Sequence, residues 1–224
     1  MLLAFDTAQD VCSVALGRAP GTPPVVVGAR MRRGHADALL GMIAEATARA
    51  GGSLSGVERI VCGVGPGSFT GVRVAIAAAR GLALALDVPA TGFSTLESLA
   101  AAARAEGATA PVLAAVASRG DTVYAQTFSA AGVPLSAPAL LDAASAARRA
   151  GARAGLVIGS GAPLLAPHLP AWRVVKQPRM GVAECLLELA MAAPDARWHE
   201  MPVPLYLRPP DATPPGPLLP EGGR

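Results

Sequence analysis

The order of apolar and polar residues predicts an antiparallel start to the chain. Apolar runs at 2–7 and 11–17 are separated by the short polar turn 8–10, which is the pattern of a β-hairpin. A further apolar run at 24–32 predicts a third strand. A Rossmann domain would begin instead with one strand, a glycine loop and a helix. The pattern therefore favours a β-meander and counts against a dinucleotide-binding domain.

Alternating helices and strands follow up to about residue 106. Apolar residues at helical spacing predict a helix over 35–51, which Gly51 and Gly52 end. The next predicted elements are a strand, a long apolar helix, a strand and a helix at 58–65, 68–87, 88–94 and 95–107. The first half therefore has the order β-β-β-α-β-α-β-α.

The second half repeats this order more weakly. It predicts a strand, its hairpin partner, a short helix, a glycine-ended strand and a helix at 110–118, 121–132, 143–151, 154–162 and 182–193. We expect an α/β fold with two subdomains, residues 1–106 and 107–208, and a boundary near 107–111. The proline-rich end excludes a long helix, and we expect the tail 209–224 to be disordered.

The composition indicates a globular protein with a core of small and aliphatic side chains. Apolar residues make up 52% of the chain and charged residues 16%, which excludes a disordered class. The net charge of +3 comes from arginine, since Lys176 is the only lysine. The densest basic cluster is Arg30, Arg32 and Arg33, so tight, direct RNA binding is not expected.

Cysteine usage and the apolar runs predict a cytoplasmic protein without a membrane partner. Three widely spaced cysteines favour a reducing compartment and count against disulfides and zinc. Asp6 interrupts the start of the chain where a signal peptide would continue. The longest apolar stretch, 72–88, contains Arg73, Arg80 and Asp87, and we expect it to be too short for a membrane span.

The glycine-rich segment 63–73 is the strongest candidate for a phosphate site. It lies between a buried strand and a helix start, where free N–H groups and the helix dipole favour an anion. It lacks the lysine of a P-loop and is one residue off the dinucleotide fingerprint. A tight turn, shaped by Pro66 and capped by Ser68 or Thr70, explains it equally well. The candidate phosphate-binding residues are Asp6, Thr7, Gly65, Gly67, Ser68, Thr70 and Gly71.

The other candidate catalytic groups do not form a set. His35 would need a second metal ligand four residues on, and none stands there. His168 and His199 lie in proline-flanked loops, so no Ser-His-Asp grouping can be argued. Residues 118–121 and 159–161 fit strand-end turns as well as a site.

Four longer motifs follow one another along the chain. They read LLAFDTAQDVCSVAL at the start, GVGPGSFTGVRVAIAAARGLALAL in the middle, STLESLA after it and PLYLRPP near the end. In sequence and order they resemble the TsaB (YeaZ) family, and the resemblance extends to about Pro210. It implies the duplicated actin-like/Hsp70/sugar-kinase fold (ASKHA, RNase H-like).

The resemblance also implies a non-catalytic role. Such a subunit binds and activates TsaD, which forms the threonylcarbamoyl group on N6 of adenosine 37 in tRNAs that read codons beginning with A. The implied partners are TsaD and TsaE homologues, with tRNA contacted only through the complex. From the helix surface described below we also expect a homodimer when TsaD is absent. No cofactor of its own is implied, although ATP or ADP shared at the complex interface stays open.

Two departures from the superfamily count against chemistry in this chain. TsaD holds a metal through a His-x-x-x-His pair, and here His35 is followed by Leu39, so neither a metal site nor a metalloprotease is expected. Ala117 stands where family members often have aspartate. An active ATPase or kinase of the same fold is the main alternative, and it needs a carboxylate near Asp6 or in 117–121. A direct tRNA-binding module is a further alternative.

Helices 35–50 and 70–86 are the predicted partner surface. Both are rich in small and aliphatic residues, which allow close helix packing. The expected interface residues are His35, Leu39, Met42, Arg73, Ile76, Ala77, Arg80 and Leu84.

Overall fold

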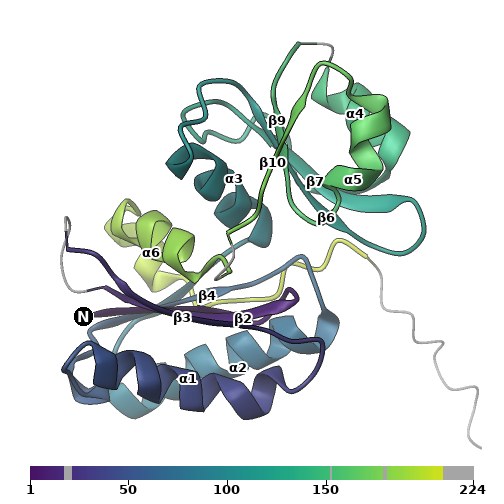
Figure 1. Ribbon diagram of the computed structural model, residues 1–224. Helices are drawn as coiled ribbons and strands as arrows, with labels where there is room; N and C mark the ends of the chain where they lie inside the picture. The colour runs from purple at the N-terminus through teal and green to yellow at the C-terminus, as the bar shows by residue number, and fades with distance from the viewer. Residues whose placement is uncertain (18–21, 152, 179–180, 209–224) are drawn as a thin grey trace, which may run out of the picture.

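Five strands of the first half form one mixed sheet in the order β3-β2-β1-β4-β5 (Figure 1). The computed structural model of the chain describes residues 1–17, 22–151, 153–178 and 181–208. The three leading strands pair antiparallel, and β4 and β5 extend the sheet in parallel. The strands are β1 Leu2–Asp6, β2 Val11–Gly17, β3 Val25–Arg30, β4 Arg59–Gly63 and β5 Ala90–Phe93.

The second half builds a sheet of the same design, in the order β8-β7-β6-β9-β10. Its leading strands are again antiparallel, and β9 and β10 are again parallel additions. The strands are β6 Val112–Ala117, β7 Thr122–Phe128, β8 Ala139–Asp142, β9 Leu156–Ile158 and β10 Arg173–Val175. The matching order confirms the duplicated α/β fold with two subdomains.

Helices cover both faces of each sheet. In the first sheet α1 and α2 pack on one face and α6 on the other, whereas α3 covers one face of the second sheet and α4 and α5 the opposite face (Figure 1). The helices are α1 His35–Arg49, α2 Phe69–Leu86, α3 Thr95–Ala105, α4 Ala143–Ala150, α5 Ala162–Leu165 and α6 Ala183–Met191. Short 3₁₀ turns are η1 Leu54–Gly56, η2 Ala166–His168 and η3 Asp195–His199.

Strand β1 shows why the apolar runs are nearly continuous. Leu3 and Phe5 point into the core under α1 and α2, while Ala4 faces α6 on the other side. Side chains alternate between the two faces of a strand, so a sheet buried on both faces needs apolar residues at every position.

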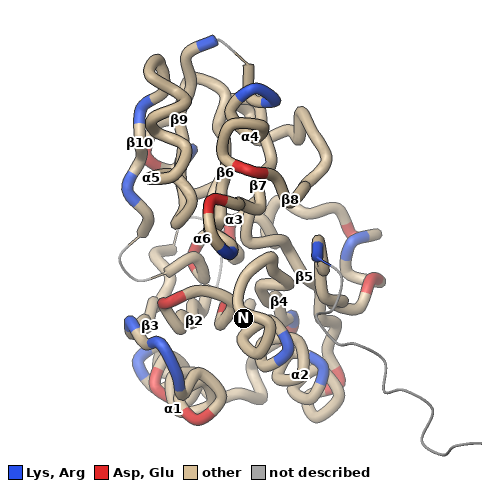
Figure 2. The backbone as a smooth tube through the Cα atoms, turned by 90° about the vertical axis from the view of Figure 1, so that its right-hand side faces the viewer, with Lys and Arg blue, Asp and Glu red and all other residues tan. Residues whose placement is uncertain are grey.

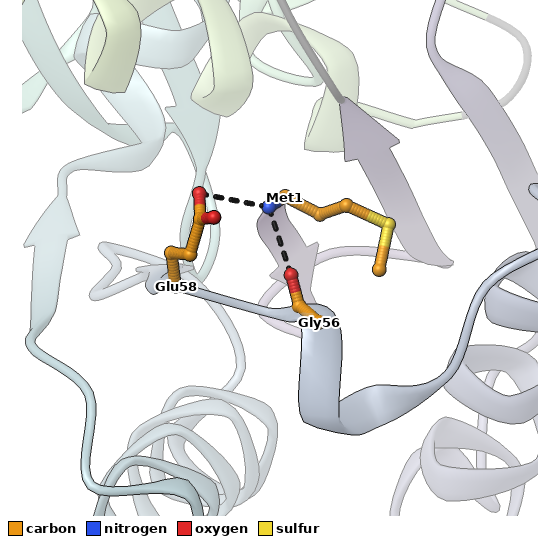
Figure 3. A network of polar contacts seen from close by, with 3 residues as sticks. All are labelled: Met1, Gly56 and Glu58. Carbon is orange, nitrogen blue, oxygen red and sulfur yellow. Dashed lines mark hydrogen bonds and ion pairs between the residues drawn. The ribbon is translucent and has the colours of Figure 1, made fainter.

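The N-terminus is fixed beside the start of β4. The Met1 amine donates to the carbonyl of Gly56 at 2.9 Å and pairs with the Glu58 carboxylate at 3.0 Å (Figure 3). The Glu58 amide in turn donates to the Met1 carbonyl at 2.8 Å. Because Glu58 is exposed, water weakens the ion pair, and the contacts serve mainly to set the parallel register of β1 and β4.

Most predicted elements are confirmed, and the misses are short. The sequence analysis did not find β8, β10 or α5, which have three or four residues each and too few positions to show a period. The division between 106 and 107 stays a proposal. In the structure, α6 and the extended residues 201–206 pack against the first sheet, and the tail from 209 lies outside the described residues.

Helix α2 reaches the length and apolarity of a membrane span, contrary to the expectation that this stretch is too short. Among the described helices it is the only one that does so, and a core helix of a soluble protein meets the same criteria. Here Val72, Ala75, Ile76 and Ala79 of α2 lie in the core against the first sheet. The apolarity of α2 therefore has a packing explanation.

Candidate functional site

The glycine loop packs directly onto the turn between β1 and β2. The Thr7 hydroxyl donates to the carbonyl of Gly71 at 2.6 Å, and the Ser68 amide donates to the carbonyl of Ala8 at 2.8 Å. A Cβ atom on Gly71 or Gly67 would collide with the carbonyl groups of Thr7 or Ala8. These two glycines therefore permit a close backbone approach, and the amide of Ser68 is already used within the protein.

Ser68 also begins α2 as predicted. Its side-chain oxygen accepts a hydrogen bond from the Gly71 amide at 3.3 Å. Thr70, the other predicted cap, lies one residue inside the helix and is exposed. The cap satisfies one of the amides that a helix start leaves without an intrahelical partner.

Asp6 is a buried carboxylic acid at the end of β1. One carboxylate oxygen accepts from the Ala8 amide at 3.2 Å, and the other, Oδ1, finds no hydrogen-bond partner in the described part of the protein. Burial raises the pKa of Asp6 from 3.8 to about 7, against the opposing effect of the Ala8 and Gln9 amides. Asp6 thus exchanges a proton near neutral pH and is an unfavourable place for a lasting negative charge.

A cleft of about 610 Å³ lies between the two halves, next to Asp6. Its volume falls in the range of roughly 300–1,000 Å³ that is usual for small-molecule sites. Among the described residues, its charged and histidine lining consists of Asp6, Asp10, Arg30, Arg32, His35 and Lys176. In charge and size the cleft suits a ligand that carries phosphate.

Only part of the predicted phosphate set reaches this cleft. Asp6, Gly67 and Ser68 line it. Thr7 and Gly71 are instead joined by a hydrogen bond from the Thr7 hydroxyl to the Gly71 carbonyl. Gly65 and Thr70 are not among the lining residues. Sequence reasoning missed Lys176 and the cleft-facing role of Arg30 and Arg32, because long-range folding brings them together.

The residues of the second half that the structure describes supply no carboxylate to the cleft. Ala117 lies at its edge, where its amide donates to the Ser160 hydroxyl at 3.0 Å. Asp121 lies in the exposed turn before β7 and is not a lining residue. The described cleft therefore has acidic groups on one side only, in Asp6 and Asp10.

The predicted partner surface divides into core and surface residues. Leu39, Met42 and Ile76 are at most 8% exposed and pack against the first sheet, so they belong to the core and not to the outer surface of the two helices. They occupy the inner stripe of α1 and α2, which the sheet covers. His35 is partly buried at the cleft, where its Nε2 lies 2.9 Å from the carbonyl oxygen of Gln9.

The outward stripe of α2 holds the remaining four predicted residues, Arg73, Ala77, Arg80 and Leu84. All four are exposed, and Leu84 is 86% exposed. Both arginines contact the extended residues 201–206, which we call the C-terminal strap. Sequence reasoning missed these contacts, although the motif PLYLRPP marked the segment.

Among the described residues, charges of both signs are spread over both halves of the molecule rather than gathered into one basic face (Figure 2). This distribution gives no support to a broad surface for the RNA backbone, which would need clustered arginine and lysine.

The chain matches known proteins over most of its length. The family model described as TsaD, tRNA N6-adenosine threonylcarbamoyltransferase, matches residues 23–152. The tRNA threonylcarbamoyladenosine biosynthesis protein TsaB of Escherichia coli K12 is 40% identical over 126 residues, which are 55% of this chain and 52% of that protein. The protein of that name from Haemophilus influenzae is 40% identical over 124 residues, 55% of this chain and 51% of that protein. The chain thus spans about half the length of these curated relatives.

Two solved structures from Pseudomonas aeruginosa share the whole architecture. One is described as an uncharacterized protein with similarity to peptidase YEAZ, with 35% identity, a TM-score of 0.76, and coverage of 92% of this chain and 99% of that chain. The other, YeaZ, has 33% identity and a TM-score of 0.75 with the same coverage.

Proposed function

The chain belongs to the TsaB (YeaZ) family, and from this premise we propose that it is the non-catalytic subunit that binds and activates a TsaD homologue. The reaction served is formation of the threonylcarbamoyl group on N6 of adenosine 37 in tRNAs that read codons beginning with A. The names of the curated relatives support the pathway, since they refer to tRNA threonylcarbamoyladenosine biosynthesis.

The exposed stripe of α2 is the observation that carries the proposal. Leu84 is 86% exposed and Phe69 is 53% exposed, so two large apolar side chains of α2 lie at the surface. Ala77 and Gly81 lie exposed between them. Small residues allow a second helix to approach closely. Arg73 and Arg80 lie on the same stripe, and a mixture of exposed aromatic, aliphatic and arginine side chains is typical of a protein interface.

Helix α1 extends this surface. It packs beside α2 under the first sheet, and Leu40 on its outer side is 60% exposed (Figure 1). A helix pair of this kind suits a helical face on the TsaD homologue. Without that partner, the same surface would pair with a second copy of this chain.

The cleft supports a role without chemistry. Among the described lining residues, the carboxylates Asp6 and Asp10 come from the first half alone, and the second half offers Ala117 instead of an acidic side chain. The position four residues after His35, where a second metal ligand would stand, is occupied by Leu39, and the Leu39 side chain is buried. We therefore assign the transfer step to the TsaD homologue, with metalloprotease activity excluded from the proposal.

An active ATPase or kinase is the second candidate, because the cleft has a suitable size and its described lining includes the cationic side chains Arg30, Arg32 and Lys176. ATP or ADP shared with the partner would satisfy these charges without catalysis by this chain. We further propose that a TsaE homologue is the third member of the complex and that this chain reaches tRNA only through the complex. We also propose that the protein is located in the cytoplasm.

Co-purification with the cognate TsaD homologue tests the proposed surface. We expect Leu84→Glu and Ala77→Glu to abolish the complex and to leave the melting temperature unchanged, because both side chains are exposed. Val133→Glu is the matched control, since Val133 is a 59% exposed apolar residue in the loop between β7 and β8. Retention of the complex by both α2 variants would place the partner elsewhere, and unfolding of either would assign that position to the core.

A further inference from the structure

The C-terminal strap is attached to the first half at few points. The Leu205 amide donates to the carbonyl of Val64 at 2.9 Å, at the end of β4. Pro202 is buried, whereas Val203 is 62% exposed. An extended segment with so few backbone hydrogen bonds depends on side chains of neighbouring elements to stay in place.

Two arginines of α2 provide these side-chain contacts. Arg80 donates from Nε at 3.1 Å and from Nη2 at 2.7 Å to the carbonyl oxygen of Pro202. Arg73 donates from Nε to the Tyr206 hydroxyl at 3.0 Å, and its guanidinium carbon lies 3.7 Å from the centroid of the Phe69 ring. The centroids of the Tyr206 and Phe69 rings are 5.6 Å apart. Charged donors and a stacked arginine make these contacts stronger than ordinary surface contacts.

The spacing of the arginines sets the direction of the strap. Arg73 and Arg80 are seven residues apart, which places them two turns apart on one side of α2. Arg80 contacts the beginning of the strap and Arg73 its end, so the strap runs antiparallel to the helix. Val203 and Tyr206 are thereby exposed next to the outward stripe of α2.

We propose that the strap forms part of the surface that receives the TsaD homologue, and that Arg73 and Arg80 are positioning residues that order it beforehand. This inference rests on the proposed function. A segment ordered before association loses less conformational entropy when the partner binds. Release of the strap should therefore weaken binding even though the fold and the outward face of α2 remain.

The test compares full-length variants for three quantities: the Kd for the TsaD homologue, the melting temperature, and the exchange rate of the Leu205 amide. We expect Arg80→Ala to weaken binding about tenfold, which corresponds to about 1.4 kcal/mol. It should speed exchange at Leu205 without changing the melting temperature, and Arg80→Lys should recover part of the affinity, since lysine keeps one donor for Pro202.

A double-variant cycle separates an effect through the strap from direct contact of Arg80 with the partner. Val203→Ser should weaken binding in the wild-type background and have no further effect beside Arg80→Ala, because a released strap no longer presents Val203. Fully additive effects would overturn the inference. An Arg80→Ala variant that exchanges quickly at Leu205 and binds within about twofold of wild type would overturn it as well.

Two further variants keep the result interpretable. If Arg80→Ala fails to fold, Tyr206→Phe removes the hydroxyl that accepts from Arg73 and keeps the ring, and the same loss of affinity is expected. Leu84→Glu reports on the proposed function alone. Loss of binding in Leu84→Glu with an unchanged Kd in the strap variants refutes only the inference about the strap. Unchanged binding in all of them refutes the α2 surface too.

Discussion

Replacement of Asp6 by asparagine tests the buried acid at the end of β1. The pKa of Asp6 is raised by burial from 3.8 to about 7, a rise of about three units. At about 1.4 kcal/mol per unit, this corresponds to at most about 4 kcal/mol of stability that the wild type loses when the carboxyl ionises. Asparagine removes the titration and keeps an oxygen acceptor for the Ala8 amide.

The sign of the pH effect follows from the proton count. Between about pH 4 and about pH 7 the unfolded chain releases the Asp6 proton while the folded chain retains it, so the folded state binds more protons. The free energy of unfolding therefore falls as the pH rises through this window and levels off above about pH 7. In the Asp6→Asn variant this fall should be absent. At pH 8 the variant should be more stable by about 1–3 kcal/mol, because a new unpaired amide donor offsets part of the gain.

Urea unfolding of both proteins at half-unit steps from pH 4 to pH 8 measures this difference. Asp10→Asn serves as the control, since Asp10 is an exposed carboxylate in the same turn. Parallel pH profiles for wild type and Asp6→Asn would refute the reasoning, because they would mean that Asp6 ionises alike in both states.

Two further predictions concern packing and thiol reactivity. Gly71→Ala should destabilise the protein by about 3 kcal/mol in urea unfolding, because its Cβ would overlap the Thr7 carbonyl. Gly81→Ala, in the same helix with open space around its Cβ, should stabilise by about 0.5–1 kcal/mol, and equal effects would contradict the packing argument. The three buried cysteines should resist a thiol reagent at pH 8 until the protein unfolds, since burial raises their pKa values; fast labelling of the native protein would refute their burial.

The fold could be predicted from the sequence because the apolar runs coincide with buried strands and the expected cap residue coincides with a helix start. Strand β1 is apolar at successive positions and buried on both faces, and α2 begins at the predicted Ser68 cap. Short elements such as β10 escaped, because three residues cannot display a period. Their pairing with a distant strand is a property of the whole fold.

The candidate surface was predicted less well, for a physical reason. Helix α2 is apolar around most of its circumference, so the sequence does not tell which stripe the sheet covers; Ile76 lies inside and Leu84 outside. The partners of the two arginines are more than 120 residues away in sequence, at Pro202 and Tyr206. Only the folded chain brings these residues together.

We propose that this chain activates a partner and does no transfer itself. The most direct measurement is threonylcarbamoyl transfer to tRNA, with ATP hydrolysis followed in parallel, for this chain alone, for the cognate TsaD homologue alone, and for both together with the TsaE homologue. The account predicts no activity from this chain alone and turnover by the TsaD homologue only when this chain is present. Transfer or ATP hydrolysis at a comparable rate by this chain alone would contradict the account and assign the chemistry to the cleft beside Asp6.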